Sequence, residues 1–289
     1  MTSSTPFQLF PPALTYTRPR RDVAALTKWL VIRDNFNLIT WIAFGAFVQG
    51  IASVCLPPTY ALLPAAGFLL HRVLNTLFMY LGLVRNPHMD EVLLGKFTAQ
   101  IPGRDGSPPR DPAQEDITVI ILAGRSNHPL GSLAPGYPKL VSYIGRMVSE
   151  LSRGKEEYGF LGYTGWTALT EQPSNNQVMV VCYFRTLDDL HGFAHGPLHR
   201  KGWGWWNKIT KSHPYISIMH EVYHAPKGHW ENIFINNHLT GIANTVSRVN
   251  IDNAKVRPLF SGNLGSMRSQ LGRLGRGDGA ENAEFDEPY

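Results

Sequence analysis

The sequence predicts an α+β protein in which a ferredoxin-like βαββαβ domain follows an N-terminal hydrophobic helical membrane segment. Over residues 117–246, strand and helix periodicities alternate in the order strand, helix, strand, strand, helix, strand. Residues 36–84 instead carry two long apolar stretches separated by prolines. A chain of 289 residues can hold one such domain with extensions.

The chain begins with a basic segment and a predicted hairpin. Residues 1–35 are rich in proline, serine, threonine and arginine, and we expect a mobile basic arm. The membrane-associated hairpin is predicted over residues 36–84. Its first stretch, Asn37–Val54, carries no formal charge and is close to the ~20 residues that cross a bilayer core. Leu56–Pro58 breaks it, and a second apolar stretch occupies Tyr60–Leu83.

Basic residues orient this hairpin. Arg72 and Arg85 favour the cytosolic side, as do the basic residues ahead of the first stretch: Arg18, Arg20, Arg21, Lys28 and Arg33. We therefore expect the main domain to lie in the cytosol. His71 and Arg72 would be costly at mid-bilayer, so the second stretch either spans the bilayer or lies in its interface. A pair of buried helices in a soluble protein is the alternative.

The segments that flank the main domain are expected to lack a core. Residues 85–116 are interpreted as a linker with one short strand at Lys96–Ile101. Residues 247–289 lose all periodicity and become rich in glycine, arginine and acidic residues. We expect this C-terminal segment to be a disordered tail.

The first half of the domain supplies three strands and a helix. Ile117–Ala123 is a run of mostly β-branched residues that suits a strand covered on both faces. Tyr137–Leu151 has apolar residues at helical spacing. The pattern predicts two strands joined by a polar turn, at Phe160–Leu169 and Val178–Phe184.

The second half supplies two helical segments and two strands. Thr186 is placed to cap a helix that begins with two aspartates. Pro197 suits the first position of another, with Gly196 as its cap. Ile216–Ala225 and Trp230–Asn236 read as strands. Helices in such a fold cover one sheet face, and the other is apolar here, so we expect a homodimer.

One helix concentrates unusual side chains. His199, Trp203 and Trp206 recur at spacings of four and three and share one face. His195 lies before the helix start, so its alignment with His199 is open. These residues indicate a pocket wall, and a tryptophan-rich helix packed on the sheet is the alternative.

The last two strands carry polar residues among apolar ones. Glu221 and Tyr223 share one strand face, while His220 and His224 share the other. On the next strand Glu231 alternates with three residues: Trp230, Asn232 and Asn236. A buried carboxylate needs a partner, so each acid is either part of a pocket or a paired structural residue.

Several functional classes are excluded. The chain has no glycine-rich phosphate loop and no nucleophile elbow, and no glutamate accompanies His195 and His199 as a zinc hydrolase requires. Cys55 and Cys182 suggest neither a disulfide framework nor a metal site, and they fit a reducing compartment. Net charge is +5, but no basic stripe with aromatics runs through the domain, which argues against nucleic-acid binding.

Five collinear segments between Lys96 and Thr245 carry a family resemblance: GKFTAQIP, EYGFLGYTGW, FRTLDDLHGFAHGPLHRKGWGWWN, MHEVYHAPKGHWENIFINN and HLTGIANT. Together they resemble the fungal fumagillin-cluster-type monooxygenase family, of the antibiotic-biosynthesis-monooxygenase group of dimeric α+β barrels. The resemblance implies a homodimeric barrel at the endoplasmic-reticulum membrane. It also implies tailoring of a lipophilic terpenoid or polyketide in fungal secondary metabolism.

Such barrels can oxidise electron-rich substrates with molecular oxygen and without metal or flavin, given a base, oxyanion donors and aromatic walls. His199 or Glu221 is the candidate base, and Tyr223, Asn236 and Trp206 are candidate donors. The remaining candidates for substrate contact are His195, Trp203, Trp206, Trp230 and Glu231. Three alternatives stay open: haem bound through His199 or His195, a non-oxidative cyclase or isomerase, and a non-catalytic lipid-binding scaffold.

Overall fold

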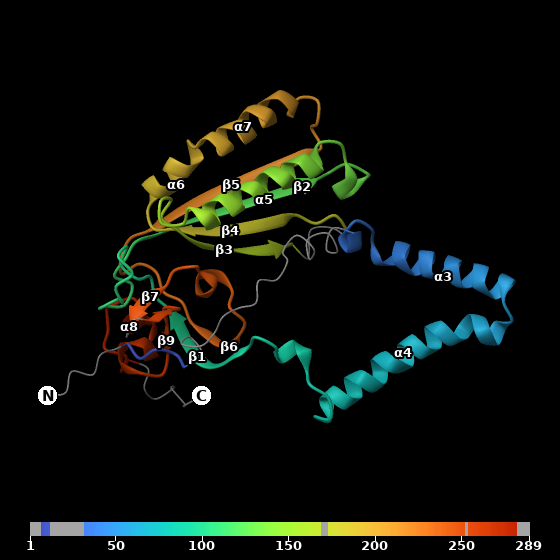
Figure 1. Cartoon of the computed structure of the whole chain (residues 1–289), viewed down its shortest axis with the longest axis horizontal. Helices are drawn as coiled ribbons and strands as arrows, with labels where there is room; N and C mark the ends of the chain where they lie inside the picture. Colours follow the sequence, from blue (N-terminus) through green and yellow to red (C-terminus); the bar gives the residue numbers. More distant parts are fainter. Residues whose placement is uncertain (1–6, 12–31, 169–172, 252–253, 282–289) are drawn as a thin grey trace.

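A computed structural model describes residues 7–11, 32–168, 173–251 and 254–281 (Figure 1). The α+β architecture is confirmed. A helix-covered antiparallel sheet lies above a second, smaller sheet, and a helical hairpin projects to one side. Most of the predicted basic arm, including Arg18, Arg20, Arg21 and Lys28, lies outside the described residues.

The larger sheet has the ferredoxin-like strand order β3-β4-β2-β5, and all its neighbours are antiparallel. Its strands are β2 (Ile117–Ser126), β3 (Phe160–Thr167), β4 (Val178–Phe184) and β5 (Ile216–Ala225). One face is covered by α5 (Tyr137–Arg153), α6 (Leu187–Ala194) and α7 (Pro197–Ile209), as Figure 1 shows. The predicted βαββαβ order is confirmed.

Local signals explain these helices. The hydroxyl of Thr186 accepts a hydrogen bond from the amide of Asp189 (3.1 Å), which satisfies a donor left open at the start of α6. Gly196 is the N-cap of α7, and Pro197 follows it. Gly202 lies where α7 meets α5, since a Cβ there would come 2.6 Å from Cε of Met147. Because Cε is the flexible end of the Met147 side chain, an alanine at this position would require that side chain to shift.

The smaller sheet contradicts two expectations. Its central strand β1 (Leu93–Ala99) pairs with β6 (Phe234–Asn237) and β9 (Leu259–Ser261). Residues 85–116 are therefore more than a linker. The last predicted strand begins at Phe234 and joins this sheet instead of extending the larger one.

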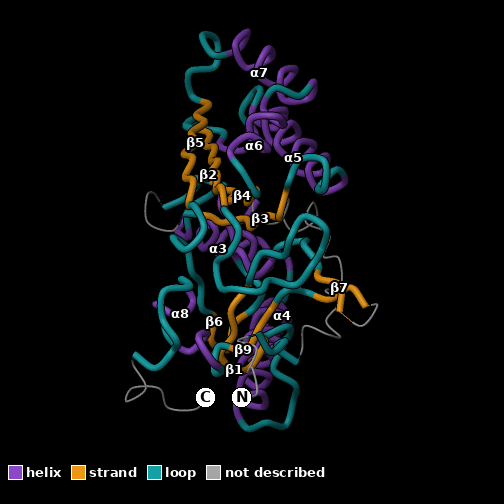
Figure 2. The backbone as a smooth tube through the Cα atoms, turned by 90° about the vertical axis from the view of Figure 1, so that its left-hand side faces the viewer, coloured by secondary structure: helices purple, strands orange, loops and turns teal. Residues whose placement is uncertain are grey.

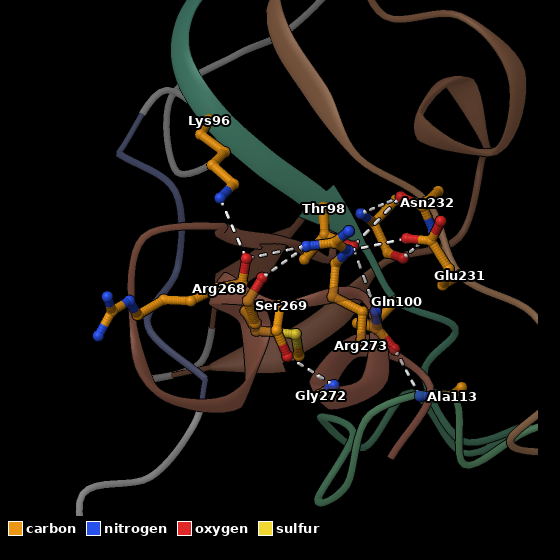
Figure 3. A network of polar contacts seen from close by, with 12 residues as sticks. Lys96, Thr98, Gln100, Ala113, Glu231, Asn232, Arg268, Ser269, Gly272 and Arg273 are labelled. Atoms are coloured by element: carbon orange, nitrogen blue, oxygen red, sulfur yellow. Dashed lines mark hydrogen bonds and ion pairs between the residues drawn. The ribbon is translucent and has the colours of Figure 1, made fainter. Parts of the chain in front are cut away.

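The predicted disorder of residues 247–289 is wrong for 247–251 and 254–281. Besides β9, this segment forms β7 (Val249–Ile251), β8 (Ala254–Val256) and α8 (Gln270–Arg273). A polar network also fixes it: Arg273 pairs with Glu231, and the ammonium group of Lys96 donates to the carbonyl of Arg268 (Figure 3). Strands of three residues are too short to show a period, which is why the sequence pattern missed them.

Part of the predicted mobile arm is also folded. Phe10 is buried and its ring lies 4.9 Å from that of Phe97 in β1, while Leu9 forms a bridge with Phe260. Apolar burial of this kind outweighs the polar composition around it. The expectation of mobility is therefore wrong for residues 7–11.

The two sheets share a core. Ile117 and Leu161, from the larger sheet, pack in one cluster with Phe97, Trp230 and Leu259 from the lower part of the molecule. Figure 2 shows the smaller sheet stacked below the larger one. One end of the sheet face that was expected to bind a second copy is thus covered by the chain itself.

Two helices, α3 (Leu38–Cys55) and α4 (Pro58–Tyr80), form the hairpin, and both are long and apolar enough to cross a membrane. The side chain of Asn37 caps α3 by accepting from the amide of Thr40 (2.8 Å). The side-chain amide of Gln49 donates to the carbonyl of Ala61 (3.1 Å) and links the two helices. α3 has no buried side chain and α4 has one, Ala61, so the alternative of buried core helices does not fit the structure.

Candidate active site

The most distinctive side chain of the helical layer is His199, in the first turn of α7. It is half-buried, with ring centroids 6.1 Å from Phe193 and 6.2 Å from Trp203. Its Nδ1 is enclosed by the protein. Burial lowers the pKa of His199, a backbone hydrogen bond with Ala194 opposes that shift, and His195 and His220 add smaller lowering contributions. The imidazole is therefore neutral near pH 7 and able to accept a proton.

His220 faces His199 from the neighbouring strand. Ile216 of β5 is buried in the core beneath α5 and α7, so His220 and His224, at the same parity, also face the helices. His220 is exposed, and Trp203 is 61% exposed. The predicted set did not include His220. His220 lies four positions after Ile216 and therefore on the same strand face. This spacing could have placed it beside His199.

The other two residues predicted for this helix face have different environments. His195 is exposed at the C-terminal cap of α6, and its Nδ1 lies 2.8 Å from the carbonyl oxygen of His191. Trp206 packs with Leu140 and Ile216 in the core between α5, α7 and the sheet. The packing alternative is therefore right for Trp206, whereas His199 and Trp203 remain near the surface.

Glu221 and Tyr223 lie on the opposite face of the sheet. The Tyr223 hydroxyl donates to Oε2 of Glu221 (2.6 Å), and this hydrogen bond raises the pKa of Tyr223. Both side chains are exposed. Because the sheet separates them from His199, one pocket cannot hold all three, and the single composite site expected from the sequence is wrong.

The remaining three candidates are structural. The Trp230 indole is buried in the shared core and donates to the carbonyl of Glu115 (2.7 Å). Glu231 accepts from Nε of Arg273 at 2.8 Å. Asn236 accepts from the amide of Gly95 (2.8 Å) and has a positive φ of 46°. These side chains hold the smaller sheet together, so their predicted contacts with substrate are not supported.

The described residues contain no group of three or more histidine, cysteine or acidic side chains that could hold a metal ion. A single haem ligand would not require such a group.

Solved structures with a similar chain path include SnoaB, a cofactor-independent oxygenase from Streptomyces nogalater. Its TM-score is 0.26 and its identity 15%, over 37% of this chain and 90% of that one. An aldoxime dehydratase in complex with butyraldoxime has a TM-score of 0.38 and 12% identity, over 52% of this chain and 43% of that one.

The sequence comparisons are more extensive. Residues 117–242 match the family described as monooxygenase af470-like. Monooxygenase af470 of Aspergillus fumigatus is 32% identical over 278 residues, which cover 94% of this chain and 99% of the relative. The chain therefore belongs to the monooxygenase af470-like family and is an enzyme, a monooxygenase of the oxidoreductase class.

Proposed function

We propose that this enzyme tailors a fungal secondary metabolite, oxidising a lipophilic terpenoid or polyketide intermediate at the membrane with His199 as base. The observation that carries the proposal is the environment of His199: a neutral, half-buried imidazole packed against Trp203, with His220 facing it. Exposed Trp203 beside it offers an apolar surface for a flat substrate. His220 is available to donate a hydrogen bond to an oxyanion.

The chemistry needs only substrate, oxygen and a base. His199 takes a proton from a methylene that an adjoining enol or phenol makes acidic. The carbanion gives one electron to O₂, and the resulting radical pair combines to form a C–O bond. Protonation of this peroxide by the histidinium, followed by loss of the second C–H proton, breaks the O–O bond. The methylene becomes a carbonyl, and the second oxygen atom leaves as water.

The hairpin supports the choice of substrate class. α3 and α4 expose apolar side chains along their whole length, and Leu38, Phe47 and Val54 are examples. A segment of this kind would hold the catalytic domain at a membrane in which terpenoids and polyketides dissolve. We place the enzyme at the endoplasmic reticulum with its domain in the cytosol.

The test measures oxygen uptake by full-length enzyme in detergent, with an anthrone as a probe whose methylene becomes acidic through its enol form. His199→Ala should lower the rate 10²–10⁴-fold, the usual contribution of a general base. The matched control is His229→Ala, because His229 is an exposed histidine in the turn after β5. Glu221→Gln, on the other sheet face, should also leave the rate within about twofold.

Three results would replace the proposal. An unchanged rate in His199→Ala with a large loss in Glu221→Gln would move the base to the other face of the sheet. A Soret band that disappears in His199→Ala would identify a haem enzyme. Product formation at full rate without oxygen would identify an isomerase or cyclase.

A further inference from the structure

A second candidate site lies where β4 ends and β3 begins. A pocket of about 250 Å³ opens there between the loop 103–106, the start of β3 and the segment around β7 and β8. Five cationic side chains line it: Arg104, Lys155, Arg185, Arg248 and Lys255. Among the described residues, the acidic lining consists of Asp105 and Glu156. The pocket is therefore strongly basic.

The two innermost cations are held by carbonyl groups. Arg185 donates to the carbonyls of Pro102 (2.6 Å) and Gly103 (3.3 Å), and Arg248 donates to those of Ser247 (2.9 Å) and Val246 (3.3 Å). Burial lowers the pKa of both guanidinium groups, and for Arg248 no acidic side chain among the described residues opposes that shift. A desolvated cation without a counter-ion is unfavourable. An anion bound from solution would relieve that cost.

Glu115, Glu156 and Asp189 act on Arg185, but the described lining still carries five cationic side chains against two carboxylates. Glu156 lies 3.5 Å from Nζ of Lys155, but its side chain is 77% exposed, so the ion pair is weak. Asp105 is engaged by the amide of Ser107 (2.8 Å). Among the described cations of the lining, Arg104 has the shortest ion pair, since its guanidinium group lies 2.6 Å from Oδ2 of Asp189.

We infer that this pocket binds the phosphate or diphosphate group of a small soluble molecule. Guanidinium groups bind phosphate oxygens in pairs, and the adjacent lysines add point charges for a multiply charged anion. A partly open pocket of about 250 Å³ suits a small anionic group. Figure 1 shows that β4 ends at the side of the sheet opposite the hairpin, so a lipid headgroup in the membrane at α3 and α4 is not the favoured source.

This site is separate from the proposed catalytic one. Among the described residues, the lining includes none from α7 or β5, which carry His199 and His220. The inference can therefore succeed or fail independently of the monooxygenase mechanism.

The test uses full-length protein in phosphatidylcholine nanodiscs and inorganic diphosphate as the probe. Calorimetry at constant ionic strength should detect saturable binding. Acetylation of Lys155 and Lys255, followed by mass spectrometry, should slow by at least about fivefold when diphosphate is present. Arg248→Gln and Lys255→Gln should each weaken binding about tenfold or more, the equivalent of about 1.4 kcal/mol. Lys211→Gln, at an exposed turn after α7, is the control and should bind normally.

If Arg248→Gln does not fold, the exposed Lys255→Gln still decides the question. Absence of diphosphate binding, or binding that neither pocket variant weakens, would overturn the inference. A third arm adds phosphatidic acid to the nanodiscs without diphosphate. Protection of the two lysines in that arm alone would identify a lipid-headgroup site and would also overturn it.

Discussion

Arg273 is the residue on which the order of the C-terminal segment depends most. Its Nε donates to Glu231 at 2.8 Å, and its Nη1 donates to the carbonyls of Met267 (3.1 Å) and Arg268 (3.2 Å). The side chain of Arg273 is 8% exposed and that of Glu231 is 24% exposed. Arg273→Met keeps the apolar stem but leaves a largely buried carboxylate and two carbonyl groups without this donor (Figure 3).

Breaking one side of a buried ion pair costs about 3–5 kcal/mol. Because Glu231 keeps some contact with water, we expect the lower end, about 3 kcal/mol. At about 1.4 kcal/mol per tenfold, the opening equilibrium of the segment should rise by about a hundredfold. Removing both charges in Arg273→Met with Glu231→Leu should restore most of the loss, since no unpaired carboxylate then remains.

Hydrogen exchange read by mass spectrometry measures this directly. Amides of β9 and α8 should exchange about a hundredfold faster in Arg273→Met, while those of β4 should be unchanged. Arg276→Met is the matched control, because Arg276 is exposed on the same segment. Unchanged exchange in Arg273→Met would show that the network does not hold the segment and would refute the reasoning.

Three further predictions concern the pH response, the hairpin and the oligomer. Burial holds the pKa of His199 below its usual 6.5, so unfolded chains take up a proton that the folded protein does not, and stability should decline below pH 6.5. His199→Gln should flatten that decline in thermal unfolding. Cys182 is buried with its pKa raised to about 12, which leaves exposed Cys55 as the reactive thiol. If the hairpin spans the membrane, Cys55 in sealed microsomes should react with an impermeant maleimide only after permeabilisation, and immediate labelling would contradict a span. Trp166 (47% exposed) and Tyr223 (56%) mark the uncovered part of the sheet face, so light scattering should give a dimer that Trp166→Glu dissociates. A monomeric wild-type protein at micromolar concentration would count against that interface.

The elements that could be predicted from the sequence are those long enough to show a period. β4 and β5 begin and end where the pattern places them, since each is a run of seven to ten residues rich in β-branched, aromatic and other apolar side chains. β9 has three residues, and it is stable because β1, far away in the sequence, pairs with it. Local propensity carries no information about such a partner.

The sequence predicts individual residues of the candidate site, but it does not predict which of them lie together in space. The alternation of side chains along a strand places Glu221 and His220 on opposite faces of the sheet, as the structure does. The alternation alone does not say which of these faces the helices cover. The sequence therefore predicts His199 and Glu221 in one pocket, although they lie on opposite sides of the sheet. Glu231 was assigned to substrate for a related reason: its partner Arg273 lies 42 positions away, in a segment without a recognisable pattern.

The strand order of the smaller sheet has a consequence for synthesis of the chain. β1 leaves the ribosome early, directly after the hairpin, yet one of its neighbours, β9, follows about 160 residues later. At about 5–20 residues per second, β1 stays unpaired on that side for roughly 8–32 s. During this interval its edge could pair with another nascent chain on the same polysome. Slow translation, or a ribosome stalled before Leu259, should therefore increase aggregation of this protein.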